Sequence, residues 1–135
     1  MPFVAICRGA GYSPTNQMLD NAEFDDIYKS AVWIDVGEND TMGIGGSMGN
    51  NELMQHTYNK QKSMIPGGTE NITTKTLTNP DPNGMPETIQ SVLHDYTIKD
   101  ESIYRLSVNP DWGHSYFISW NSDFITWLFS KSVRD

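Results

Sequence analysis

Short stretches of alternating apolar and polar residues recur along this chain, and each of them predicts a β-strand. The stretches are rich in β-branched and aromatic residues, which favours strand over helix. The predicted strands cover residues 3–8, 31–36, 72–78, 88–98, 102–108, 116–120 and 124–129. Turn residues separate them, most clearly in the run Asn-Pro-Asp-Pro-Asn-Gly at 79–84. Short strands at regular spacing predict a mainly all-β fold: a single-domain antiparallel β-sandwich of residues 1–135 with at most one or two short helices.

Helical patterns are weaker and concern three segments. A capping-box spacing followed by apolar residues three to four apart predicts a short helix near 21–30. Residues 53–65 suit one face of a helix and one face of a strand equally well, so both interpretations stay open. Residues 122–131 also leave strand and helix open; we favour a strand at 124–129, because the turn residues at 121–123 predict a hairpin. The alternative there is a helix capped by Ser122.

Charge narrows the range of partners. The chain has 17 acidic and 9 basic residues, which gives a net charge of −8, and the basic residues form no run. Nucleic-acid binding needs Lys and Arg to displace counterions from phosphates, so this composition argues against a nucleic-acid partner. It also disfavours adhesion to anionic lipid. Neutral or zwitterionic lipids and sugars remain compatible. A basic enzyme is also a compatible partner. An acidic inhibitor or immunity protein is therefore one alternative function.

The single cysteine and the N-terminal residues bear on the cellular compartment. Cys7 cannot form an internal disulfide, and its apolar neighbours predict a buried small side chain. The first residues lack the basic start and long apolar run of a secretory signal, and no stretch is apolar enough to span a bilayer. We therefore expect a soluble protein without a signal peptide. It would be cytoplasmic as made, and released from there if it acts on target membranes.

No pattern of metal or cofactor ligands stands out. The three histidines lack a His-x-x-x-His spacing, and one cysteine cannot make a Cys-x-x-Cys pair. The turn at 81–84 lacks the acidic residues of a calcium loop, and the glycine-rich segment 37–50 lacks the lysine of a phosphate-binding loop. We therefore predict neither a metal nor a cofactor.

One motif points to hydrolysis. The sequence Gly-Gly-Ser-Met-Gly at 45–49 matches the G-x-S-x-G pattern, in which a sharp turn exposes a nucleophilic serine, here Ser47. The candidates for the general base are His56, His94 and His114. Against this hypothesis, the serine lies far beyond the predicted strand at 31–36, and the chain is short for a hydrolase sheet flanked by helices. A small serine hydrolase is therefore a second alternative function, and a non-enzymatic protein is the expectation.

Aromatic residues concentrate in the last third of the chain. Eight of the fifteen lie between residues 104 and 129: Tyr104, Trp112, Tyr116, Phe117, Trp120, Phe124, Trp127 and Phe129. Most of them fit a β core. Trp112 differs, because it stands in a turn between Pro110 and Gly113, where a large ring is hard to bury. A loop tryptophan suits a lipid headgroup region or the face of a sugar ring.

The order of features in the second half of the chain resembles the aegerolysin family. The corresponding stretches are Ile-Pro-Gly-Gly at 65–68, the strand at 72–78, Asn-Gly-Met-Pro-Glu-Thr-Ile at 83–89 and Val-Asn-Pro-Asp-Trp-Gly-His-Ser at 108–115. Aegerolysins are small, acidic, cysteine-poor β-sandwich proteins. The resemblance implies a non-enzymatic protein that recognises membrane lipid, often together with a larger pore-forming partner protein, and some bacterial relatives act against insects.

The resemblance also implies where the ligand is bound. Trp112 occupies the matching turn and is the main candidate contact, with its sequence neighbours His114 and Tyr116. Trp33, on the predicted strand at 31–36, is a further candidate. The expectation is a membrane-lipid- or glycan-binding protein that forms one component of a cytolytic or insecticidal toxin system.

Overall fold

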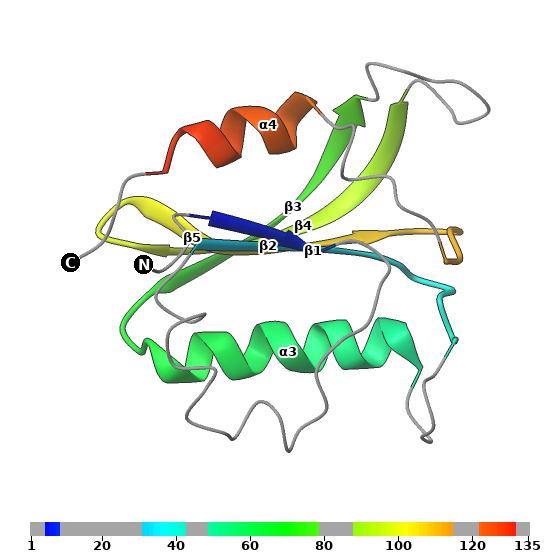
Figure 1. Cartoon of the computed structure of the whole chain (residues 1–135), viewed down its shortest axis with the longest axis horizontal. Helices are drawn as coiled ribbons and strands as arrows, with labels where there is room; N and C mark the ends of the chain where they lie inside the picture. Colours follow the sequence, from blue (N-terminus) through cyan, green and yellow to red (C-terminus); the bar gives the residue numbers. More distant parts are fainter. Residues whose placement is uncertain (1–4, 9–30, 43–48, 79–87, 115–121, 132–135) are drawn as a thin grey trace.

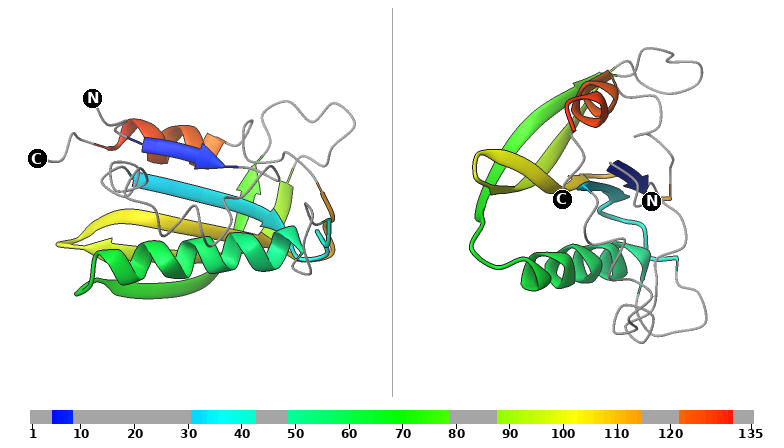
Figure 2. Two further views of the ribbon diagram at one scale, coloured as in Figure 1. Left: turned by 60° about the horizontal axis from the view of Figure 1, so that its bottom comes forward. Right: turned by 60° about the vertical axis from the view of Figure 1, so that its left-hand side comes forward.

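The computed structural model describes residues 5–8, 31–42, 49–78, 88–114 and 122–131, and these form one sheet with two helices. The elements are β1 (Ala5–Arg8), β2 (Ala31–Gly37), α3 (Asn50–Met64), β3 (Thr69–Thr78), β4 (Thr88–Ile98), β5 (Glu101–Asn109) and α4 (Ser122–Phe129). The five strands lie in the order β1-β2-β5-β4-β3. β1, β2 and β5 run parallel, whereas β4 and β3 are antiparallel to their neighbours. Figures 1 and 2 show α3 on one face of the sheet and α4 on the other.

The mainly β architecture with two helices confirms the fold class expected from the strand pattern, but not the packing of two sheets. Among the described residues there is a single sheet, and helices stand where a sandwich would place its second sheet. Part of the sheet is also parallel. An alternating strand shows that a face is apolar, but a helix can cover such a face as well as a second sheet can.

β2 is the centre of the molecule, because both of its faces are covered and all seven of its residues are buried. Val32, Ile34 and Val36 face α3 and join the core cluster that contains Met54 and Tyr58 of that helix. The alternate residues face α4, and here Trp33 packs with Leu93, Phe124 and Trp127. The sheet therefore separates two small cores, one under each helix.

The segment at 53–65, which the sequence left open, is helix α3. Its buried residues Asn50, Met54, Thr57, Tyr58 and Gln61 recur at intervals of three or four. A strand would have placed His56 on the same face as Met54 and Tyr58, and His56 is exposed.

The strand favoured for 122–131 is wrong, since residues 122–129 form α4. The reason is packing: only a helix brings Phe124 and Trp127, three residues apart, onto the same side, where both rings meet Trp33 at 5.9 and 5.6 Å between centroids. The predicted helix near 21–30 and the predicted strand at 116–120 lie outside the described residues.

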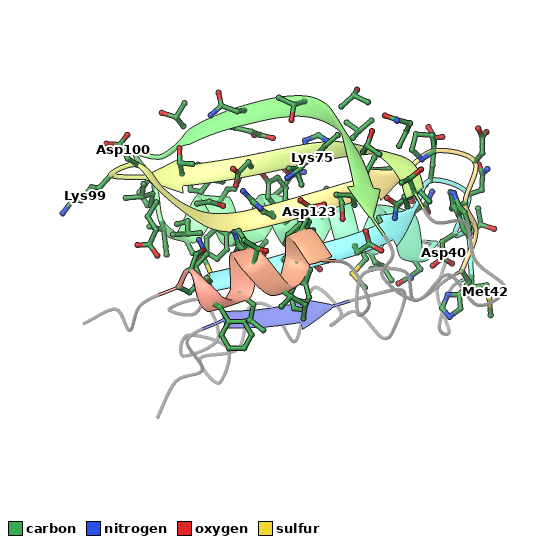
Figure 3. All side chains as sticks on the ribbon, turned by 90° about the horizontal axis from the view of Figure 1, so that it is seen from above. Asp40, Met42, Lys75, Lys99, Asp100 and Asp123 are labelled. Carbon is green, nitrogen blue, oxygen red and sulfur yellow. The ribbon has the colours of Figure 1, made fainter. Side chains whose placement is uncertain are left out.

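The turn between β4 and β5 is a tight hairpin of Lys99 and Asp100, both with positive φ (49° and 64°). It lies at one end of the sheet, and Asp40 and Met42 lie at the opposite end (Figure 3). The hairpin agrees with the connection expected at 99–101.

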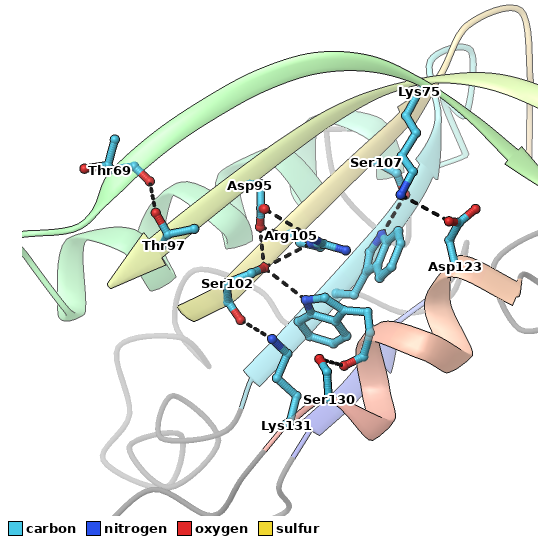
Figure 4. A network of polar contacts seen from close by, with 12 residues as sticks. Thr69, Lys75, Asp95, Thr97, Ser102, Arg105, Ser107, Asp123, Ser130 and Lys131 are labelled. Carbon is cyan, nitrogen blue, oxygen red and sulfur yellow. Dashed lines mark hydrogen bonds and ion pairs between the residues drawn. The ribbon is translucent and has the colours of Figure 1, made fainter. Parts of the chain in front are cut away.

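A polar network fastens α4 to the sheet (Figure 4). Arg105 of β5 pairs with Asp95 of β4, with Nε and Oδ1 3.0 Å apart, and its guanidinium lies over the ring of Trp33 at 5.0 Å. Ser102 accepts a hydrogen bond from the indole nitrogen of Trp127 at 3.0 Å. Charge, hydrogen bonds and ring contacts therefore support the same packing of helix on sheet. Neither α3 nor α4, the helices of the described part of the chain, is long and apolar enough to cross a membrane.

Candidate functional site

The most constrained surface of the described chain lies where β2 and β5 end. These strands are adjacent and parallel, so the segments that follow them emerge side by side. We call residues 37–42 and 109–114 together the β2–β5 rim; Figure 3 shows Asp40 and Met42 within it. The carboxyl ends of parallel strands are where open sheets covered by helices commonly place their ligands.

Backbone hydrogen bonds join the two halves of the rim. The amide of Glu38 donates to the carbonyl of Asn109 at 2.9 Å, and the amide of Asn39 donates to the carbonyl of Trp112 at 2.8 Å. Gly37 allows this close approach, because a Cβ there would clash with the carbonyl oxygen of Trp112. Backbone contacts alone thus hold the two segments of the rim against each other.

A buried aspartate links the rim to the first turn of α3. Asp40 is 1 % exposed, and its Oδ2 accepts a hydrogen bond from the side-chain amide (Nδ2) of Asn50 at 2.7 Å. Nδ1 of His114 lies 3.0 Å from the same oxygen, and the imidazole side chain is 32 % exposed. The backbone amide of Asn51 donates to the Asp40 carbonyl at 2.8 Å. Asp40 therefore fixes the orientation of a histidine at the surface.

Trp112 is half-buried in this rim. It packs against Leu77 and Ile89, at adjoining ends of β3 and β4. Its amide donates to Asn109 at 3.3 Å, and Asp111 before it has a positive φ of 63°. The indole is thus fixed on one side, and part of its surface remains open to solvent.

A second buried carboxylate, Asp35, lies on the α4 side of β2. Its Oδ1 accepts a hydrogen bond from the hydroxyl of Ser107 and another, at 2.9 Å, from the side-chain amide (Nδ2) of Asn109. Ser107 in turn accepts a hydrogen bond from the indole nitrogen of Trp33 at 3.0 Å. Burial raises the pKa of Asp35 to about 6, and the hydrogen bonds from Ser107 and Asn109 only partly oppose this. Within the described residues, Oδ2 of Asp35 has no hydrogen-bond partner.

The residues expected to contact a ligand do not all share one place. Trp112 and His114 both belong to the rim. Trp33 does not: it is fully buried between α4 and Arg105, so it cannot touch a membrane or a sugar, and its assignment as a ligand contact is corrected. Tyr116 and Ser47 lie outside the described residues.

Of the three histidines proposed as a base, only His114 belongs to the rim. His56 is exposed on α3, and Nδ1 of His94 lies 3.2 Å from Oε1 of Glu70. The described chain stops at Met42 and resumes at Gly49, directly before α3. Among the described residues, no group of three His, Cys, Asp or Glu side chains could hold a metal ion.

Comparisons with protein-family models, characterised proteins and solved structures find no match. The resemblance to aegerolysins therefore stays a prediction from the sequence, and a single sheet between two helices gives it no added support.

The sequence analysis missed Asp35 and Asp40. The only local signal was an acid inside an apolar strand, as in Ile34-Asp35-Val36. The partners that make its burial tolerable, Ser107 and Asn109, are more than seventy residues away.

Proposed function

We propose that this protein is a non-enzymatic glycan-binding protein and that the β2–β5 rim is its binding site. The observation that carries the proposal is Trp112: a half-buried indole, packed on one side against Leu77 and Ile89 and held by backbone hydrogen bonds, in the same turn as an oriented imidazole. A rigid aromatic face offers a sugar ring an apolar platform, and the polar groups around it can bond the hydroxyls. Because the rim is already ordered, little conformational entropy is lost on binding.

The composition of the rim favours a glycan over a lipid surface. Neither segment contains Lys or Arg, and Glu38, Asp40 and Asp111 are acidic. Such a surface repels anionic headgroups. Trp112 is packed against Leu77 and Ile89, which leaves less indole to insert into a bilayer. We therefore favour neutral or amine-bearing sugars, and treat zwitterionic lipid as the competing outcome of the same assay.

Replacing Trp112 by Ala is expected to weaken glycan binding by about tenfold or more, because burial of an aromatic contact contributes roughly 1.5–3 kcal/mol. Binding would be measured by calorimetry on the glycan that scores best in an array of neutral and amino sugars. Trp112→Phe keeps part of the packing on Leu77 and Ile89, and should bind with intermediate affinity.

The matched control is Phe129→Ala, which removes an aromatic residue that is 82 % exposed on α4, away from the rim. It should bind as the parent does. Equal losses in both variants, or full binding by a folded Trp112→Ala, would contradict the rim assignment. Binding of the parent to zwitterionic vesicles and to no glycan would replace the glycan by a lipid.

One observation favours a second function, a serine hydrolase. The pair of His114 and buried Asp40 has the arrangement in which an aspartate orients a general base, and Ser47 follows Asp40 closely in the sequence. Of the three candidate bases, we therefore favour His114.

A fluorophosphonate probe separates the two functions, and we expect no labelling of the parent protein. The probe reacts with a serine only when a neighbouring base activates the hydroxyl. Labelling that disappears in both Ser47→Ala and His114→Asn would make the protein a hydrolase. Labelling that survives in either variant would be non-specific and would leave the binding function standing.

A further inference from the structure

The outer edge of β3 is ten residues long, and no strand in the described part of the chain pairs with it. β3 is the last strand of the sheet and pairs with β4 at all ten positions from Thr69 to Thr78 without a bulge. On its other side no described segment runs along it, as Figures 1 and 2 show. The edge of a sheet presents a row of backbone donors and acceptors that another strand can use.

The features that usually protect such an edge are missing or already engaged. β3 contains no proline, and its two charged side chains are Glu70 and Lys75. Glu70 is paired with Lys62 of α3 and with His94 of β4, and Lys75 with Asp123 of α4 at 3.1 Å. Neither charge is therefore directed outward to repel an incoming strand.

An apolar side chain lies at the middle of the edge. Ile72 is 59 % exposed, and its neighbours Asn71, Thr73 and Thr74 are exposed and uncharged. An exposed aliphatic residue among uncharged polar neighbours, on a strand without a bulge, is the composition found where strands associate.

We propose that β3 pairs with the β3 of a second copy of this chain, in an antiparallel dimer whose two-fold axis passes beside Ile72. In this register Ile72 meets Ile72, Asn71 meets Thr73, Glu70 meets Thr74 and Thr69 meets Lys75 of the other copy. Facing residues in an antiparallel pair lie on the same face of the sheet. In this register Ile72, Glu70 and Thr74 lie on one face in both copies. The two sheets then continue as one.

Charge favours this edge over the rest of the surface for contact between two copies. The chain carries −8 overall, so two copies repel each other over most approaches, but Glu70 and Lys75 give this strand no net charge. In the proposed register no like charges stand opposite each other. A two-fold contact of this kind is closed, so it yields a dimer and not a fibre. The rim takes no part, and the inference stands independently of the proposed function.

Sedimentation velocity of the parent protein should show a monomer–dimer equilibrium between about 1 and 200 µM, as expected for a small interface. Ile72→Lys places two ammonium groups opposite each other and should weaken the dimer by about tenfold or more. The residue is exposed, so the fold is expected to persist, which circular dichroism would verify.

Phe129→Lys makes the same change of charge at an exposed apolar residue of α4, and should leave the dimer intact. A parent that stays monomeric throughout this range would overturn the proposal. So would dissociation by Phe129→Lys with no effect of Ile72→Lys, which would move the interface to α4. Open-ended polymers of the parent would exclude the closed two-fold pairing.

Discussion

Trp33→Ala is expected to lower the free energy of unfolding by about 3–5 kcal/mol, the range seen when large core aromatics are truncated. Trp33 is fully buried at the centre of the core under α4, in edge contact with Phe124 and Trp127. The substitution opens a cavity and removes the indole N–H that donates a hydrogen bond to Ser107. It also removes the ring beneath the Arg105 guanidinium. A domain of this size has about 5–15 kcal/mol of stability, so the loss is a large part of the total.

Urea unfolding followed by circular dichroism measures this change. The control is Phe129→Ala, whose exposed ring should contribute less than about 0.5 kcal/mol. Trp33→Phe refills most of the space but cannot donate to Ser107, and should lie between the two. A loss below about 1 kcal/mol for Trp33→Ala would contradict the packing of α4 on the sheet, because exposed positions rarely cost more.

Asp35→Asn is expected to make the protein more stable at pH 8, by up to about 3 kcal/mol. Burial raises the pKa of Asp35 from 3.8 to about 6 in the folded protein. Between about pH 4 and 6 the folded state therefore holds a proton that the unfolded state has released, and stability falls as the pH rises through this window. Above pH 6 the full cost of a buried charge is present. The amide carries no charge, and its oxygen can still accept from Ser107 and Asn109.

The measurement is the difference in unfolding free energy between parent and Asp35→Asn at pH 8 and at pH 4.5. The difference should be largest at pH 8 and small at pH 4.5. Glu70 titrates in the opposite sense: its burial acts to raise the pKa, but hydrogen bonds from Lys62 and His94 outweigh this and hold it low. Its contribution is lost as the pH falls, but it is common to both proteins and cancels. A parent more stable than the variant at pH 8 would mean that Asp35 is held as a needed charge.

The strand pattern could be followed from the sequence because it depends on neighbours along the chain. The segment predicted at 88–98 is β4 within those bounds, and that at 31–36 is β2 with one residue added. Alternation of apolar and polar residues is enforced locally by the pleat of each strand, whatever it packs against. The mainly β class followed from the number of such segments.

The candidate site could be foreseen only in part. Trp112 drew attention because a turn limits burial of a large ring, and His114 as its neighbour in the sequence and as a candidate base. Asp40 did not, since nothing in its own segment announces a buried carboxylate or its pairing with a histidine 74 residues away. Trp33 was wrongly predicted to contact a ligand. Its strand pattern is compatible with an exposed or a buried indole, and only the packing of α4 over it shows that the ring is buried.

Local periodicity thus decided where the strands lie, because side-chain alternation is a property of a few consecutive residues. Tertiary contact alone decided that 122–129 is a helix, that β2 lies beside β5, and that two acids are buried where those strands end. These outcomes depend on partners far apart in the chain. The free energy of burying a charge or an indole is set by the groups around it in space, which the order of residues does not reveal.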